Sequence, residues 1–345
     1  MKKYLFFLLL IAQTAILNAQ SKSDKEPFLT KSLTSESIKN VDVVTSGGSI
    51  SVTGVSSGAR IEVYVSPNNN KNNLSKEEIQ KRLDELYNLN IAVANNKLTA
   101  SAKNKEKITD WKKALNISFK VFVSQSVSTD LTTSGGSISL DNLSGNQDFS
   151  TSGGSLHVDA VTGKINGRTS GGSIHVENSK NEIDLTTSGG SIHAKNCEGK
   201  IRLNTSGGSL MLSGLKGEIK ATTSGGSVSG SGVQGEMEAN TSGGNIQFTD
   251  LSCSLETSTS GGNIDVSFKE LGKYVKISNS GGNIDLQLPR NKGLDLKLAG
   301  NKIKTDKLEN FNGKIDDDEV EGKLNGGGVP VTVKAGSGRI SLALK

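Results

Sequence analysis

Apolar and polar residues alternate in short runs along most of this chain, and the pattern repeats at a fixed interval. Each repeat opens with Thr-Ser-Gly-Gly, then Ser or Asn, then Ile, Leu or Val. A fixed period of about this length is typical of solenoids, in which each repeat forms one coil stacked on the last. The eight regular copies begin 18 residues apart, at Thr133, Thr151, Thr169, Thr187, Thr205, Thr223, Thr241 and Thr259.

Two short strands are predicted within each repeat. With the Thr numbered as position 1, positions 6 and 8 are mostly apolar, as in Ile174 and Val176. Positions 15 and 17 repeat the pattern less strictly, as in Ile183 and Leu185. Such alternation indicates strands with one buried face. We therefore expect an all-β, single-stranded β-helix, with 18 residues per coil. Right-handed winding is expected because parallel crossovers are usually right-handed.

Glycines mark the two corners of each predicted coil. One pair stands at positions 3 and 4, and another glycine recurs at position 13, where Asn181 replaces it in one copy. Glycine adopts positive φ without strain and asparagine tolerates it, so both corners are expected to use left-handed backbone. Ser or Asn at position 5, from Ser137 to Asn283, should form a ladder that bridges coil to coil by hydrogen bonds.

The N-terminal region departs from the period and predicts a cap. An isolated early copy of the motif begins at Thr45, and residues 60–65 and 116–123 alternate as strands do. Between them, Ser75 followed by Glu78 has the spacing of a helix capping box, ahead of an apolar series. A short helix covering the open end or flank of the first coil is therefore expected.

The C-terminal region also becomes irregular. The spacing stretches to 20 residues between Thr259 and Asn279, and the acidic run at 316–319 breaks the repeat. A final strand is predicted within 337–344. We thus expect four segments, namely a signal peptide, an N-terminal cap with the first coil and helix, the regular coils, and C-terminal coils with a cap. Their predicted bounds are 1–19, 20–130, 131–290 and 291–345.

The first segment has the pattern of a secretory signal peptide. Lys2 and Lys3 precede an apolar run over 4–17, and Ala19 offers a cleavage site. The run is too short to span a bilayer and no transmembrane segment is expected. Removing the two lysines lowers the net charge from +5 to +3, too weak a bias to predict nucleic-acid binding. The mature protein is expected in the periplasm, on the cell surface or secreted.

Composition agrees with a slender repeat protein. The chain has 41 Gly, 4 Pro and 4% aromatic residues, which is unlike an ordinary globule with a thick core. Its two cysteines, Cys197 and Cys253, fall three coils apart, or about 14 Å at about 4.8 Å per coil. A disulfide needs Cα atoms within about 7 Å, so two free thiols are expected.

All three histidines, His157, His175 and His193, stand at position 7 of consecutive repeats. That position points outward, so the imidazoles should form a column at about 4.8 Å spacing. Imidazole is a common ligand for Zn, Cu and Ni, and Asp159 and Glu177 could add oxygen ligands from the same face. Two hypotheses follow: a metal site, or a solvated column copied by repeat duplication.

The sequence contains few residues in arrangements that would support catalysis. Asp265 and Asp285 share the outward column and, as paired carboxylates, would suit a glycosidase or a cation site. The only tryptophan, Trp111, lies outside the regular coils and offers no sugar platform beside them. We therefore expect a non-enzymatic protein without a cofactor. A metal- or small-ligand-binding module and a carbohydrate-active β-helix are the alternatives.

The repeats resemble the bacterial putative-adhesin family of unknown function, in the style of head-domain adhesin repeats. The resemblance rests on the Thr-Ser-Gly-Gly motif and on the segment from Asn325 to Leu342, and covers roughly residue 38 to the C-terminus. It implies an exported β-solenoid at the cell envelope or surface, with a cell-surface or envelope protein or glycan as partner, and leaves self-association open. It implies no catalytic residues.

Overall fold

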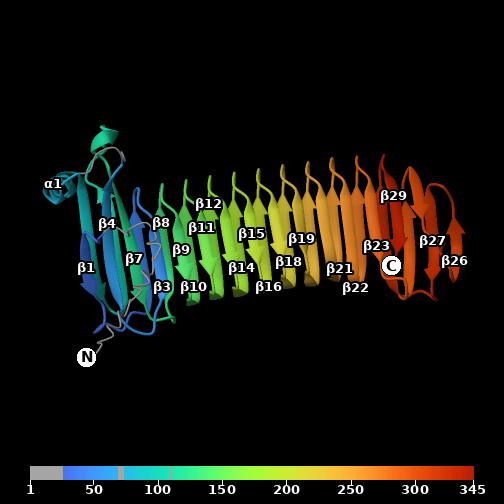
Figure 1. The fold of residues 1–345 in the computed structure, drawn as a ribbon, viewed down its shortest axis with the longest axis horizontal. Coiled ribbons are helices and arrows are strands. Elements are labelled where there is room, and N and C mark those ends of the chain that lie inside the picture. Colours follow the sequence, from blue (N-terminus) through green and yellow to red (C-terminus); the bar gives the residue numbers. More distant parts are fainter. Residues whose placement is uncertain (1–25, 69–73, 109) are drawn as a thin grey trace, which may run out of the picture.

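The structure is a computed structural model that describes residues 26–68, 74–108 and 110–345. The predicted signal peptide lies outside the described residues. The described chain forms a long shaft of side-by-side strands with a helix at the N-terminal end (Figure 1). The fold is thus nearly all-β and solenoid-like, as predicted. None of the helices in the described part is both long and apolar enough to cross a membrane.

Each regular repeat contributes two strands, as the alternation predicted. The strands that lead into the motif form one row, called row A, and those that follow it form row B. The regular strands of row A are β8 (Ser128–Thr133), β10 (Ser144–Thr151), β12 (Thr162–Thr169), β14 (Lys180–Thr187), β16 (Glu198–Thr205), β18 (Lys216–Thr223) and β20 (Gln234–Thr241). Those of row B are β9 (Ile138–Asp141), β11 (Leu156–Asp159), β13 (Ile174–Glu177), β15 (Ile192–Lys195), β17 (Leu210–Ser213) and β19 (Val228–Ser231).

Neighbouring strands in each row are parallel and in register. Ile165 of β12 pairs with Ile183 of β14, and Leu156 of β11 pairs with Ile174 of β13. Equivalent positions therefore stack into columns along the shaft. Two longer strands, β21 (Ile246–Thr259) and β22 (Ile264–Asn279), each contribute to both rows.

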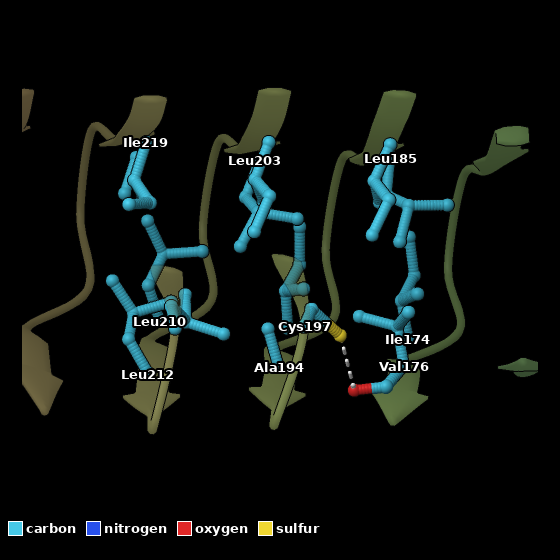
Figure 2. Close-up of a cluster of buried hydrophobic side chains, with 14 of the residues drawn as sticks. Ile174, Val176, Leu185, Ala194, Cys197, Leu203, Leu210, Leu212 and Ile219 are labelled. Atoms are coloured by element: carbon cyan, nitrogen blue, oxygen red, sulfur yellow. Dashed lines mark hydrogen bonds between the residues drawn. The ribbon is translucent and has the colours of Figure 1, made fainter. Parts of the chain in front are cut away.

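The core lies between the two rows. Figure 2 shows Leu185, Leu203 and Ile219 from row A facing Ile174, Val176 and their equivalents from row B. All five side chains are at most 1% exposed. Because every coil buries the same few apolar side chains against the next coil, stability comes from stacking rather than from any single repeat.

The buried Thr of each motif ties successive coils together. Thr205 Oγ1 donates to the Gly190 carbonyl of the preceding coil at 2.8 Å and accepts from Gly208 N of its own corner at 3.2 Å. The same pair of bonds recurs in each copy from Thr133 to Thr259. A hydroxyl that would otherwise be an unpaired buried group is thus satisfied on both sides.

The predicted ladder at position 5 is confirmed. Ser209 N donates to Ser191 Oγ at 3.1 Å, and the asparagines continue the series, with Asn263 N donating to Asn245 Oδ1 at 2.8 Å. Arg339 N closes it on Asn283 Oδ1 at 3.1 Å. Hydrogen bonds to side-chain oxygens therefore join the corners of successive coils, in addition to the hydrogen bonds between backbone groups.

The prediction of positive φ at the Gly-Gly corner is wrong. Only glycines elsewhere have φ in the left-handed region, and those at positions 3 and 4 do not. Position 4 needs glycine because the coils touch there: a Cβ on Gly208 would lie 2.0 Å from the Gly190 carbonyl oxygen. The position-13 prediction is confirmed, with φ of 122° at Gly199 and 86° at Asn181.

The N-terminal cap is built from β1 (Leu29–Ser32), β2 (Asn40–Thr45), β3 (Ile50–Gly54), β4 (Arg60–Pro67), α1 (Lys76–Leu86), β5 (Tyr87–Ala94), β6 (Lys97–Asn104), the 3-10 helix η1 (Trp111–Lys113) and β7 (Leu115–Val123). The predicted helix is present, and Ser75 Oγ accepts from Glu78 N at 3.3 Å. Strand β2 lies between β6 and β8, and β3 between β7 and β9. The later strands β6 and β7 therefore lie further from the regular coils than β2 and β3, and β5 and β4 flank them on the outer side.

The C-terminal cap has the same inverted order. Its strands are β23 (Ile284–Leu288), β24 (Leu294–Ala299), β25 (Lys302–Thr305), β26 (Phe311–Ile315), β27 (Glu319–Leu324), β28 (Val329–Ala335) and β29 (Arg339–Leu344). The predicted final strand is present as β29. It lies between β23 and β25, while β28 lies between β22 and β24. Residues 289–328 thus leave the shaft to cover its end before the chain returns.

Candidate functional site

The three histidines form the predicted column on the outer face of row B. His157 pairs with His175 and His175 with His193 across parallel strands. The rings stack, with centroids 5.1 Å apart and 7° between planes for the first pair, and 4.7 Å and 29° for the second. Adjacent parallel strands lie about 4.8 Å apart, so the strand spacing alone accounts for the stacking.

The two end members of the column, His157 and His193, have lowered pKa values. Partial burial lowers the pKa of His157 and of His193, and the neighbouring His175 lowers both pKa values further. His175 Nδ1 is buried without a hydrogen-bond partner. Protonating His157 or His193 places a charge beside the ring of His175, in a setting poorer in water than bulk solvent.

Metal binding by the three imidazoles stays a prediction. In the described part of the chain, no group of three or more His, Cys, Asp or Glu side chains is placed to hold a metal ion. Stacked parallel rings direct their in-plane lone pairs side by side rather than toward one point. A site at His157, His175 and His193 would therefore need the rings to turn.

Acidification should destabilise the protein through this column. A histidine whose folded-state pKa is lowered binds fewer protons in the folded than in the unfolded chain, so the free energy of unfolding falls as pH drops below about 6.5. Relative to a His157→Gln/His175→Gln/His193→Gln variant, the wild type should lose about 1–2 °C more in Tm between pH 7.5 and 5.5. Calorimetric scans at the two pH values measure this, and equal losses would contradict it.

The acidic pair is brought onto neighbouring strands. Asp265 of β22 and Asp285 of β23 are partners in register, on the outer face of row B. Gln247 and Ser341 occupy the same column on either side of them. Both of these neighbours are uncharged, so Asp265 and Asp285 are the two ionisable side chains among the four positions of this column.

Both cysteines are free and buried, as predicted. Burial raises the pKa of the Cys197 thiol, and it raises the pKa of Cys253 to about 12. Cys197 packs in the core and donates weakly to the Val176 carbonyl, as Figure 2 shows. Thiols that are neither exposed nor ionised at neutral pH are poor nucleophiles and poor metal ligands.

The outer face of row A carries columns of charge that the sequence analysis did not single out. Positions 12, 14 and 16 of successive coils bear acids and bases that pair across the strands. Exposed pairs of this kind contribute little to stability and can exchange partners. The ion pairs are Lys180–Glu198, Lys200–Glu218, Arg202–Asp184, Lys216–Glu198, Lys220–Glu238 and Lys276–Glu256, at 2.8–3.9 Å.

A hollow of about 240 Å³ lies on this face, from β16 to β22. Its polar lining includes Lys200, Lys220, Glu238 and the ring of Tyr274. Tyr274 donates to Glu236 Oε1 at 2.9 Å, two coils away, and the pKa of Tyr274 is raised to about 12 by partial burial and by Glu236. The hydroxyl therefore stays protonated, and the ring forms one wall of the hollow.

A β-bulge places Tyr274 over the face. The register between β21 and β22 changes from Cys253↔Leu271 to Leu255↔Val275, so extra residues bulge out beside Ser254. Bulges re-aim side chains out of the regular ladder. This bulge accounts for the 20-residue spacing seen in the sequence. The spacing alone did not indicate which side chain the bulge would redirect.

Residues 177–343 match the family Toastrack DUF4097. The Toastrack match spans slightly less than half of the chain and covers the coils from the end of β13 through most of β29, including the hollow at Tyr274. His157, His175 and the N-terminal cap lie before it. No curated protein matches the chain.

Two crystal structures are similar over most of the chain at low identity. One is a putative cell adhesion protein from Clostridium sporogenes ATCC 15579, at 11% identity and a TM-score of 0.18, covering 92% of this chain and 98% of that one. The other is a putative adhesin from Bacteroides fragilis NCTC 9343, at 12% identity and a TM-score of 0.23, covering 92% of this chain and 96% of that one.

Proposed function

We propose that this protein is a non-enzymatic, exported adhesin or envelope interaction protein. The hollow walled by Tyr274 on the outer face of row A is the observation that carries the proposal. A protein or glycan of the cell surface or envelope would bind there. The role agrees with the resemblance of the repeats to an adhesin family. We also propose that the chain is exported and that its coils wind in a right-handed sense.

The chemistry of the hollow suits a polar partner. Tyr274 offers an aromatic edge with a polar tip, and such rings are enriched where proteins bind partners. Lys200 and Lys220 supply positively charged hydrogen-bond donors in the same hollow, and Glu238 supplies a negatively charged acceptor. Because the charges are balanced by the pairs across the strands, recognition would depend on matched hydrogen bonds rather than on net charge.

A second binding surface continues toward the C-terminal end. Asn240, Ser258 and Lys276 line a neighbouring hollow of about 400 Å³ with Thr332 and Lys334. Ser258 Oγ is 2.8 Å from Asn240 Oδ1. Hydroxyl and amide groups in a row on a rigid shaft present hydrogen-bonding partners at the strand spacing, which favours an extended ligand such as a glycan chain.

Binding is favoured over cleavage. Asp265 stands in the row B half of β22, whereas Tyr274 stands in the row A half of the same strand. The acid pair and the aromatic ring therefore face away from each other across the core. The carbohydrate-active alternative would need both on one face.

Binding of the purified full chain to intact bacterial cells and to arrayed surface glycans tests the proposal. Tyr274→Ala should weaken the apparent affinity at least about tenfold, equivalent to about 1.4 kcal/mol. Trp111→Ala removes an exposed aromatic from the N-terminal cap and should leave binding unchanged. Equal binding by wild type and Tyr274→Ala, or turnover of a bound glycan, would contradict the proposal.

A further inference from the structure

The histidine column continues into a methionine. Met211 of β17 pairs in register with His193 of β15, at the same outward position. It is 41% exposed. Of the four large hydrophobic side chains exposed in the described residues, the other three (Leu29, Trp111 and Ile315) lie in the terminal caps. Met211 is thus the exception along the shaft.

The surroundings of Met211 give it no apolar partner on that face. Ser229 follows it in the column, and Lys195 and Ser213 lie beside it two residues further along the strands. An exposed thioether among hydroxyls and an ammonium group gains nothing from burial. Its other chemical property is that sulfur is a soft metal ligand.

We propose that His193 and Met211 bind a soft monovalent metal ion, Cu(I), between one imidazole nitrogen and the thioether sulfur. His175 stands on the opposite side of His193, away from Met211. Thioethers select Cu(I) among biological metals, and imidazole binds copper as well. The site goes beyond the proposed adhesin function and does not depend on it.

The spacing of the column suits such a site. Metal distances of about 2.0 Å to nitrogen and about 2.3 Å to sulfur place the two ligand atoms about 4.3 Å apart when they face each other across the ion. The ring centroids of His175 and His193 are 4.7 Å apart, and Met211 continues at the next strand. Because His193 is partly exposed, its ring can turn toward the sulfur without repacking the core.

The charged side chains near the site favour a monovalent ion over a divalent one. Lys195 lies two residues from His193 on β15, and the nearest carboxylate, Glu177, pairs with Lys195 from β13, two strands away from Met211. A neighbouring ammonium group disfavours a divalent ion more than a monovalent one. The harder ligands are thus separated from the soft one.

Anaerobic titration of the full chain with Cu(I), in competition with bicinchoninate, tests the site. Wild type should bind one equivalent, and Met211→Leu and His193→Gln should each weaken binding at least about tenfold. Met237→Leu changes a methionine that is buried in the core and should bind as wild type does. X-ray absorption of the loaded protein should show a sulfur neighbour that is absent in Met211→Leu.

Two outcomes would overturn the proposal. One is that Met211→Leu retains wild-type affinity. The other is that Cys197→Ala/Cys253→Ala, which leaves the column intact, abolishes binding, because the buried thiols would then be the ligands. Circular dichroism on each variant distinguishes a lost ligand from a lost fold.

Discussion

Replacing Gly208 with alanine is expected to destabilise the protein by at least about 3 kcal/mol. The new Cβ would lie 2.0 Å from the Gly190 carbonyl oxygen and 2.4 Å from its carbon, both in the backbone of the preceding coil. Neither atom can move aside without separating the coils. The separation would also lengthen the bond from Thr205 Oγ1 to the same carbonyl.

The adjacent glycine provides the control. A Cβ on Gly207 would meet its nearest neighbour, the Ser188 carbonyl oxygen, at 3.6 Å, an ordinary contact. Its φ is outside the left-handed region, so Gly207→Ala should change the free energy of unfolding by less than about 1 kcal/mol. Urea unfolding of both variants measures the difference. Similar losses from the two substitutions would contradict the close-approach account of the corner.

The repeating strands could be read from the sequence because period-2 alternation reports directly on burial. Ile174, Val176, Ile183 and Leu185 are inward as predicted, and the position-11 residue Cys197 is also buried. The glycine pattern was detected correctly, but its cause was not. A recurring glycine signals either positive φ or close approach, and a single sequence does not separate the two.

A further corner residue was missed. Position 10 has positive φ in the seven repeats that begin at Thr133 through Thr241, from 51° at Asn178 to 65° at Gly232. It is occupied by Asn, Gly, Ala and Asp, so no constant residue marks it. Asn142, Asn178 and Asn196 were the available signal, since asparagine is the commonest non-glycine residue in that conformation.

The inverted order of the terminal coils could not be predicted. At the N-terminal end, β6 and β7 lie further from the regular coils than β2 and β3, which precede them in the chain. At the C-terminal end, β24 and β25 lie further out than β28 and β29, which follow them in the chain. Alternation predicts a strand but not its partner. The contact of Tyr274 with Glu236 was likewise out of reach, because it depends on how a bulge turns one side chain over two coils.

Deleting residues 206–223, one whole repeat, should leave a folded and shorter protein. The cut joins Thr205 to Ser224, so every remaining residue keeps its position in the 18-residue coil, and β16 and β20, which both pair with the deleted β18, can pair with each other in the same register. In a stacked repeat protein, an interior unit contributes its own stability and one interface, and its removal does not disrupt the others. Deleting residues 206–214 alone should prevent folding. This deletion removes a corner and the row B strand of one coil, so the row A strand of that coil has no row B strand to pack against.

Small-angle scattering on these two deletions tests most directly the claim that an 18-residue coil is the unit of the shaft. The 206–223 deletion should keep a rod whose maximum dimension falls by about 4.8 Å, the spacing of parallel strands. The half-repeat deletion should give the profile of an expanded chain. Equal disruption by both deletions, or an unshortened rod after the whole-repeat deletion, would contradict the claim.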